Sequence, residues 1–445
     1  MQIQQAVSLG EDRRTPSSLR DAAGAQGLAG RKVLIIVENL PVPFDRRVWL
    51  EATTLQKAGA QVAVICPKGK GFGADYEQLE GIHIYRHTLP NDADSALGYL
   101  REYSHALWAE FGLTCKIWWK HGFDVIHACN PPDLIFLVAA PFKLIGKRFI
   151  FDHHDINPEL YEAKFGKRGF FWRLMCFLER RTFALADVSI ATNQSYKQIA
   201  VTRGGMEPDD VYVVRSGPDL RRFVSRPPDP ALKKGREYLL GYVGVMGEQE
   251  GIDLLLEAVR ELVVARGRRD IQTCLVGGGS SLPKLQAMAR DLGVDDYVTF
   301  TGRVSDEALA VALSTADVCV NPDRVNPMND KSTMNKIIEY MAMEKPIVQF
   351  DVREGRYSAG ASSLYAKAND PVDFADKIEE LLADAPRRAD MGRSGRKRVE
   401  DELSWSHQVP TLIAAYRAAM RMGDAPGRVE PAAPAEERGR FAQRP

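Results

Sequence analysis

The sequence has few cysteines, and none is placed for a disulfide framework or a zinc site. Its 445 residues include six cysteines, no two of them in a C-x-x-C arrangement, and most fall within apolar runs. Such cysteines are typical of reduced side chains in a protein core. We therefore expect a cytoplasmic protein.

The sequence also lacks a long hydrophobic run and an excess of one charge. No segment reaches the roughly 18 uninterrupted apolar residues that a membrane-spanning helix needs, so any membrane contact should be peripheral. Residues 1–31 carry scattered charges and no apolar stretch of the signal-peptide kind. Basic and acidic residues number 59 each, so no overall field favours nucleic acid as a partner.

Composition divides the chain into two tails, two domains and a linker. Residues 1–30 and 423–445, rich in Ala, Gly, Pro, Arg and Glu, predict disordered tails. A Pro-rich, charged stretch at 225–237 predicts a linker between a domain at 31–224 and a second one at 238–403. Residues 404–422 predict a closing helix packed on one or both domains. Its apolar stripe consists of Trp405, Val409, Leu412, Ile413 and Tyr416.

Short apolar runs alternate with amphipathic stretches through both predicted domains. The runs are continuous in Val and Ile, which is typical of parallel strands covered on both faces. We therefore predict an α/β fold with two Rossmann-like, doubly wound parallel sheets, and a ligand cleft where the carboxyl ends of their strands face each other. The predicted strands are 33–38, 61–67, 82–87, 124–129, 148–155, 187–193, 211–217, 238–244, 272–278, 297–302, 317–322 and 346–351.

The most informative segment is NPMNDKSTMNKIIEYMAMEKPIVQFD, residues 326–351. It resembles the donor-site segment of family 4 glycosyltransferases, where a loop enters a helix ending E-[AY]-M-A-x-G-x-P-[IV]-V, although Glu344 replaces that glycine. Further resemblances follow in the family's order: G-A-Q-V-A-V (59–64), H-D-x-x-P-E (154–159), A-D-x-x-I-A (186–191), V-V-R-S-G-P-D (213–219), G-G-G-S-S-L-P-K-L (277–285) and V-x-F-x-G-x-V (298–304).

The resemblance implies a GT-B fold and an enzyme that moves a sugar from a nucleotide-sugar donor, linked to UDP or GDP, with retention of configuration. Many relatives extend lipid-carried glycans, so the implied acceptor is a glycan or a polyprenyl-linked glycan. The implied process is exopolysaccharide or cell-surface polysaccharide biosynthesis. The donor is a substrate, so no cofactor is expected.

The donor-site segment also makes physical sense as a diphosphate site. Residues 330–332, with Ser332 among them, are cap-type residues ahead of a predicted helix at 333–343, whose free N–H groups and positive dipole end suit a diphosphate. Lys331 and Lys336 could add charge to the same oxygens. By the resemblance, Glu339 accepts hydrogen bonds from the ribose hydroxyls; otherwise it is a solvated glutamate on an amphipathic helix.

The first departure from the family lies eight residues before Glu339, where Lys331 stands in place of the usual glutamate. That carboxylate normally lies near the transferred sugar. Either Asp330 replaces it, or Lys331 changes the donor pocket by contacting a phosphate or carboxylate. A surface lysine is the remaining alternative.

A second departure lies in GYVGVMGEQEGIDLLLEAV, residues 241–259. Val245 and Glu250 replace an arginine and a lysine that the family commonly directs at the donor diphosphate. Backbone N–H groups at Gly244, Gly247 and Gly251 can still approach a phosphate. The charge could come from Lys331, Lys336, Arg324 or Arg303, the last of which, with Val304, follows the strand 297–302.

Two adjacent histidines end the predicted strand 148–155. By the resemblance, His154 is directed at the donor sugar near its C6 hydroxyl, while His153 points the other way. Asp155 orients the imidazole or approaches the acceptor; alternatively it caps the next turn. No partner spacing supports zinc, and no Asp-x-Asp stands at a strand end, so we expect a metal-independent site.

The acceptor side is predicted to include the opening loop ENLPVPFDRRVWLEA, residues 38–52. Asp45, Arg46 and Arg47 could bind a phosphate-bearing lipid-linked acceptor; alternatively they are solvated charges at a helix start. Residues 104–122 and 167–181 combine aromatic with basic side chains. This composition suits an interfacial helix at a membrane, and core packing explains it equally well.

Three alternatives remain open. A nucleotide-sugar epimerase of the same architecture would need elimination chemistry that no residue here provides. The glycines of VGGGS, residues 276–280, prompt a dinucleotide-dependent oxidoreductase but lack the G-x-G-x-x-G spacing. A catalytically silent nucleotide- or glycan-binding subunit would fit the departures at Val245, Glu250 and Lys331.

Overall fold

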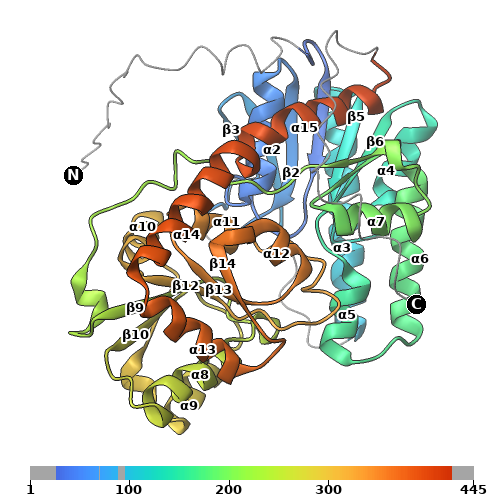
Figure 1. The fold of residues 1–445 in the computed structure, drawn as a ribbon. Helices are drawn as coiled ribbons and strands as arrows, with labels where there is room; N and C mark the ends of the chain where they lie inside the picture. The colour runs from blue at the N-terminus through green and yellow to red at the C-terminus, as the bar shows by residue number, and fades with distance from the viewer. Residues whose placement is uncertain (1–26, 70, 89–95, 423–445) are drawn as a thin grey trace, which may run out of the picture.

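The chain forms two α/β domains joined by an extended segment and by a helix that crosses from one to the other (Figure 1). The computed structural model describes residues 27–69, 71–88 and 96–422. Each domain has one sheet with helices on both faces, which is the two-domain Rossmann-like architecture predicted from the alternating runs.

The N-terminal sheet has the order β3-β4-β2-β1-β5-β6-β7-β8. All neighbouring pairs are parallel except β3 and β4. Valines and isoleucines of the central strands are buried because helices cover the sheet on both sides. The strands are β1 Lys32–Ile36, β2 Gln61–Pro67, β3 Tyr76–Leu79, β4 Ile82–His87, β5 Val125–Cys129, β6 Arg148–His153, β7 Val188–Ala191 and β8 Val211–Val213.

The C-terminal sheet is entirely parallel, in the order β11-β10-β9-β12-β13-β14. Strand order reverses between β9 and β12, which is where open sheets of this kind bind ligands. The strands are β9 Tyr238–Val243, β10 Ile271–Val276, β11 Val298–Gly302, β12 Val318–Asn321, β13 Ile347–Phe350 and β14 Ser363–Ala366.

Helices cover both sheets and supply most of the remaining core. In the N-terminal domain they are α2 Arg46–Lys57, α3 Ala96–Lys120, α4 Phe136–Leu144, α5 Asn157–Phe165, α6 Phe170–Leu185 and α7 Gln194–Thr202. Those that follow are α8 Ile252–Arg260, α9 Leu282–Asp291, α10 Asp306–Thr315, α11 Asn335–Ala342, α12 Arg353–Ala359, α13 Pro371–Leu382, α14 Ala385–Arg398 and α15 Trp405–Ala419.

Helix α15 returns from the C-terminal domain and packs on the N-terminal one (Figure 1). Trp405 and Tyr416 join its core, and the Trp405 indole N–H donates to the Thr54 hydroxyl at 2.9 Å. The apolar stripe that predicted a closing helix therefore faces the N-terminal sheet.

All twelve predicted strands are present, and two further strands were not predicted. β3 lies at the edge of its sheet with the sequence YEQL, whose side chains are half-exposed or exposed, and β14 is the four-residue edge strand SLYA. Neither has the apolar run by which buried strands are recognised.

The predicted boundaries and the observed ones differ in two places. Most of the predicted tails lie outside the described residues, but residues 27–30 pack against the turn after α2, with Leu28 fully buried and its N–H donating to the Ala58 carbonyl at 3.0 Å. The predicted linker lies along α10, where Ser314 and Thr315 accept from the N–H groups of Arg226 and Asp229.

Candidate active site between the two domains

Charged side chains from both domains meet where the domains face each other. Arg46, the first residue of α2, approaches Glu339 of α11, with 3.5 Å between Nη1 and Oε1. Lys331 reaches Glu159 of α5 at 3.2 Å, and the Asn193 side chain donates to the Lys331 carbonyl at 2.8 Å. The segment that resembles a donor site therefore lies against the N-terminal domain.

Glu339 lies on the side of α11 that faces Arg46. Its side chain is 18% exposed. Burial raises the pKa of the Glu339 carboxyl, and the Arg46 guanidinium opposes this effect. A partly shielded carboxylate in this position can accept hydrogen bonds from hydroxyl groups of a ligand between the domains.

The start of α11 differs from the prediction. The helix begins at Asn335 rather than at residue 333, and its N-cap residue, Met334, has no side-chain oxygen to cap the first turn. Residues 330–332 do not cap it: the Asp330 carboxylate accepts from the Arg353 N–H at the start of α12, at 2.9 Å, and the Ser332 hydroxyl donates to the Met328 carbonyl at 2.9 Å. The capping prediction was wrong.

Lys336 is buried in a cluster of polar groups within the C-terminal domain. Its ammonium lies 2.7 Å from Glu250 Oε2, 2.9 Å from Asp323 Oδ1 and 3.4 Å from the Tyr242 hydroxyl. Burial alone would lower the pKa of Lys336, but the attraction of Asp323 holds it well above its usual value. Burial raises the pKa of Asp323 to about 7. The charge of Lys336 is thus already balanced by two carboxyl groups.

Glu250 explains the second departure from the family pattern. The Glu250 carboxylate pairs with the ammonium of Lys336 on α11. The glycine loop therefore carries an anion where the family commonly has a cation, and α11 supplies the cation. Gly244 lies beside this pair, since a Cβ there would lie 2.6 Å from the Tyr242 hydroxyl and 3.4 Å from Lys336 Cε. The lysine therefore remains next to the loop where a diphosphate was predicted.

The glycines of VGGGS have a packing role. Gly277 has φ +138°, and a Cβ there would collide with the Gly244 carbonyl oxygen. The Met246 N–H donates to the Gly278 carbonyl at 3.1 Å, and Gly279 contacts the Met246 backbone. These glycines let the loops after β9 and β10 approach each other, so no dinucleotide fingerprint is needed to explain them.

The remaining predicted donor residues lie on the surface of the C-terminal domain. Arg303 and Val304 are exposed just after β11, and Gly247 precedes the turn that leads into α8. Arg324 forms an ion pair with Asp253 on α8. These positions surround the carboxyl ends of β9, β11 and β12.

The two adjacent histidines point to opposite sides of the N-terminal sheet. His153 is fully buried against Phe183 and Tyr196, with Nε2 3.2 Å from Glu179. His154 is 14% exposed, and its Nε2 lies 2.6 Å from Asp152 Oδ2. The Asp155 backbone N–H donates to the Asn130 side chain at 3.1 Å, and burial raises the pKa of the Asp155 carboxyl.

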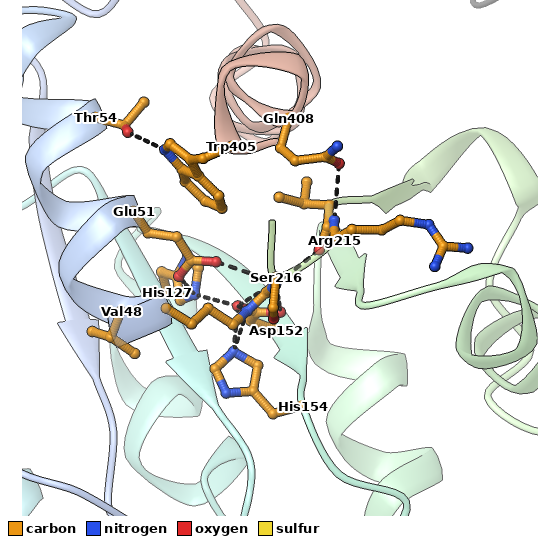
Figure 2. Close-up of polar contacts among 12 residues, drawn as sticks. Val48, Glu51, Thr54, His127, Asp152, His154, Arg215, Ser216, Trp405 and Gln408 are labelled. Carbon is orange, nitrogen blue, oxygen red and sulfur yellow. Dashed lines mark hydrogen bonds and ion pairs between the residues drawn. The ribbon is translucent and has the colours of Figure 1, made fainter. Parts of the chain in front are cut away.

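Asp152, Glu51, Arg47 and His127 form a buried polar cluster next to His154 (Figure 2). The Arg47 guanidinium lies 3.2 Å from Glu51 and 3.1 Å from Asp152, and it donates to the Val214 carbonyl at 2.8 Å. Its side chain is 9% exposed. Arg47 was predicted to meet the acceptor, but its donor groups are directed into the N-terminal domain.

Burial and neighbouring charges together set the pKa values in this cluster. Burial alone would raise the pKa of Asp152, but Arg47 holds it well below its usual value. Burial, and next the charge of Asp152, raise the pKa of Glu51 well above its usual value. Burial lowers the pKa of His127, whose Nδ1 lies 2.7 Å from the Tyr416 hydroxyl on α15. The environment of the cluster therefore favours the ionised form of Asp152 and the protonated form of Glu51.

Four side chains of this region could offer atoms to a metal ion: the ligand atoms of Glu51, Cys129, Asp152 and His154 lie within 4.8 Å of one another. Arg47 already contacts both carboxyl groups, and burial raises the pKa of the Cys129 thiol well above its usual value, which disfavours the thiolate ligand. The arginine supplies the positive charge that a metal would provide, so we assign no metal to this cluster.

The raised pKa of Glu51 can be tested by replacing this residue with glutamine. A carboxyl whose pKa is raised by folding contributes less stability as pH rises from its unfolded pKa toward the folded one. Glu51→Gln removes that loss, so the free energy of unfolding of the variant should fall less than that of wild type between pH 5 and pH 8. Urea unfolding at both pH values measures this. Exposed Glu207→Gln is the control, and equal pH slopes in wild type and Glu51→Gln would contradict the assignment.

Asp45 and Arg46 complete the opening loop. Asp45 caps α2, since its carboxylate accepts from the Val48 N–H at 3.1 Å. Arg46 projects toward the C-terminal domain, where it also pairs with Asp306 at 2.8 Å. A small pocket lies between the domains. It is lined by Arg46, Asp306, Arg222, Phe223, Leu309, Ala310 and Leu313.

Comparison with known proteins identifies the family. A model described as Glycosyltransferase Family 4 matches residues 45–222, and one described as Glycosyl transferases group 1 matches residues 237–384. The chain belongs to the family 4 glycosyltransferases. The two matches correspond to the two α/β domains, and the residues between them fall in the extended segment.

Individual relatives within this family are distant. The D-inositol 3-phosphate glycosyltransferase of Gordonia bronchialis is 27% identical over 256 residues, which cover 55% of this chain and 55% of that protein. The match therefore spans about half the length of that relative.

Solved structures with the same fold cover nearly the whole described chain. Sucrose-phosphate synthase from Thermosynechococcus elongatus superimposes with a TM-score of 0.75 at 19% identity, covering 88% of this chain and 100% of that one. Anabaena HepE in complex with UDP-glucose has a TM-score of 0.65 at 16% identity, covering 87% and 99%. At these identities the likeness shows the GT-B fold.

Several residues of this family 4 site were not identified from the sequence. Asp152 lies two residues before His154, so both side chains fall on one side of the strand, and Glu51 lies one helical turn after Arg47. These spacings could have indicated the cluster. Asp306 carries no such signal, because its partner Arg46 is 260 positions away. Asp323 precedes its partner Lys336 by 13 positions, with an irregular loop between them, so no regular spacing relates the two.

Proposed function

We propose that this chain transfers a sugar from a UDP- or GDP-linked donor to a glycan or polyprenyl-linked acceptor, with retention of configuration, in exopolysaccharide or other cell-surface polysaccharide biosynthesis. The observation that carries the proposal is the position of Glu339, on α11 of a family 4 chain and facing the opposite domain across 3.5 Å from Arg46. The complex of HepE, which has the same fold, with UDP-glucose supports a nucleotide-sugar donor.

In the proposed reaction the donor lies between the domains. Glu339 accepts hydrogen bonds from the ribose, and N–H groups of the glycine loop and of α11 approach the diphosphate. The acceptor oxygen forms a bond to the anomeric carbon on the face from which the nucleoside diphosphate departs, and its proton passes to the departing phosphate oxygen. His154, held by Asp152, binds a hydroxyl of the sugar, and the enzyme acts mainly by positioning and electrostatic stabilisation.

Ligand stabilisation tests the donor proposal. A ligand that binds only the native state raises its melting temperature. Purified protein should be stabilised by UDP or GDP and by one of their sugars, and to a smaller extent by ADP. Stabilisation by none of these nucleotides would contradict the donor site. A protein that binds them but transfers nothing would instead fit a silent binding subunit.

We also propose that the protein acts at the cytoplasmic face of a membrane. Adjacent helices α3, α4, α5 and α6 expose large apolar side chains, among which Trp119 is 90% exposed and Phe170 75% exposed. We call this set the aromatic surface: Trp108, Trp118, Trp119, Leu137, Leu144, Ile145, Phe165, Phe170, Phe171, Leu174 and Phe177. Basic residues on the same helices and loops complement an anionic lipid surface: Lys116, Lys120, Lys143, Lys147, Lys164, Lys167, Arg168 and Arg173.

None of the helices within the described residues combines the length and apolar character needed to cross a bilayer. Membrane binding as proposed depends on the exposed side chains of the aromatic surface, so removing the two most prominent aromatic ones should weaken it. The double variant Trp119→Ser/Phe170→Ser should bind phosphatidylglycerol-containing vesicles about tenfold more weakly in a sedimentation assay. Val264→Ser, an exposed apolar position on the other domain, is the control. Equal binding by the double variant and wild type would contradict the proposal.

A further inference from the structure

Arg46 connects the N-terminal domain to two carboxylates of the C-terminal domain. Its Nη1 lies 3.5 Å from Glu339 Oε1, and its Nη2 lies 2.8 Å from Asp306 Oδ1. Asp306 also pairs with Arg222. Because Asp306 has this second partner, loss of Arg46 from the group would not leave Asp306 without a cation.

Arg46 also differs from Lys336, the cation on α11 itself, in how firmly it is held. The Lys336 ammonium is nearly buried between Glu250 and Asp323. The Arg46 side chain is 44% exposed, and its contact with Glu339 is longer than a charge-assisted hydrogen bond. Arg46 can therefore change partners while Asp306 keeps Arg222 as its cation.

We propose that Arg46 binds the diphosphate of the donor and does not serve the acceptor. The inference rests on the proposed function, in which the ribose hydroxyls donate to Glu339. When they do so, Glu339 no longer depends on Arg46, and the guanidinium turns to the neighbouring phosphate oxygens, which its planar fork suits. The loop predicted to meet the acceptor thus completes the donor site from the opposite domain.

This arrangement has a structural consequence. The carboxyl that binds the ribose belongs to α11, whereas the cation that binds the diphosphate belongs to α2. A nucleoside diphosphate would contact both domains, but a nucleoside would contact only the C-terminal one. The affinity for the two ligands should therefore respond differently to substitution of Arg46.

Isothermal titration with UDP and GDP, and with uridine and guanosine, tests the inference on the full-length chain. Arg46→Met should weaken binding of the preferred diphosphate about 10- to 100-fold, the loss expected for one charge-assisted contact. Binding of the corresponding nucleoside should be unchanged or a few-fold tighter. Arg46→Lys should lie between wild type and Arg46→Met. The control is Arg221→Met, because Arg221 is exposed and pairs with Asp219 in its own loop.

The possible results separate this inference from the proposed function. If wild type binds no nucleotide, the donor proposal itself fails. If wild type binds the diphosphate and Arg46→Met binds it equally or more tightly, Arg46 is not a donor ligand and this inference is overturned, while the donor proposal stands. A rise in the KM for the acceptor, with an unchanged Kd for the diphosphate, would also overturn it. Melting temperatures of all variants verify that each is folded.

Discussion

Lys336→Met should lower the free energy of unfolding by about 3–5 kcal/mol, because removal of one partner from a buried ion pair leaves the other uncompensated. In this case two carboxyl groups lose their cation: Glu250, 2.7 Å from the ammonium, and Asp323, 2.9 Å from it and almost completely buried. Urea unfolding at neutral pH measures the loss.

The loss should also depend on pH. The pKa of Asp323 is already raised to about 7 with Lys336 present, so below pH 7 this carboxyl can take up a proton. Lys336→Met raises that pKa further, and a raised carboxyl pKa costs stability as pH increases. The variant should therefore be more strongly destabilised at pH 8 than at pH 6.

Two further variants identify the cause. Lys336→Met/Glu250→Gln should recover part of the stability, because it removes one of the unpaired carboxylates. Lys377→Met removes a half-exposed lysine that pairs with Glu380, and it should change stability by less than about 1 kcal/mol. An effect of Lys336→Met as small as that of Lys377→Met would show that the buried cluster does not stabilise the domain.

Glu339→Ala should weaken binding of the donor nucleotide about 100-fold, since hydroxyl groups bound to a charged acceptor lose their partner. Glu339→Gln retains acceptor capacity without charge and should lose less. Isothermal titration with the nucleotide that stabilises wild type provides the measurement. The control is Glu307→Gln, an exposed glutamate on α10. Unchanged affinity in Glu339→Ala would exclude Glu339 as a ribose ligand.

The two predictions separate stability from function within one helix. Lys336 and Glu339 are three residues apart on α11, but the first is nearly buried among groups of its own domain and the second faces Arg46 of the other domain. We accordingly expect Lys336→Met to act mainly on unfolding, and Glu339→Ala mainly on nucleotide binding.

Much of the fold could be predicted because its strands are local apolar runs. Each of the twelve runs corresponds to a strand, and the stripe on residues 404–420 packs on the N-terminal core. The edge strand β3 was not predicted, because its residues are polar or partly exposed and its position depends on pairing with β4. Such pairing follows from tertiary structure and leaves no apolar pattern.

The sequence could predict which residues lie near the candidate site, but not which side chains they contact. Glu339 and Lys331 lie where the two domains meet, as the resemblance implied, and the two histidines point to opposite sides. The partners of these residues could not be read from the sequence: Arg46 and Asp306 are 260 positions apart, and Lys336 and Glu250 are 86 apart. Folding brings such charges together. As a result, Lys336 forms buried ion pairs with Glu250 and Asp323, and Arg47 forms one with Asp152.

The proposed glycosyltransferase activity is tested most directly by transfer of a labelled sugar to an acceptor in membrane lipid extracts. The donor is the nucleotide sugar that raises the melting temperature of wild type. Wild type should form a labelled lipid-linked product and release the nucleoside diphosphate, whereas Glu339→Ala should form little and Glu307→Gln as much as wild type. If wild type binds the donor firmly but transfers no label to any extract, or if Glu339→Ala transfers it as fast as wild type, the proposed glycosyltransferase site is contradicted.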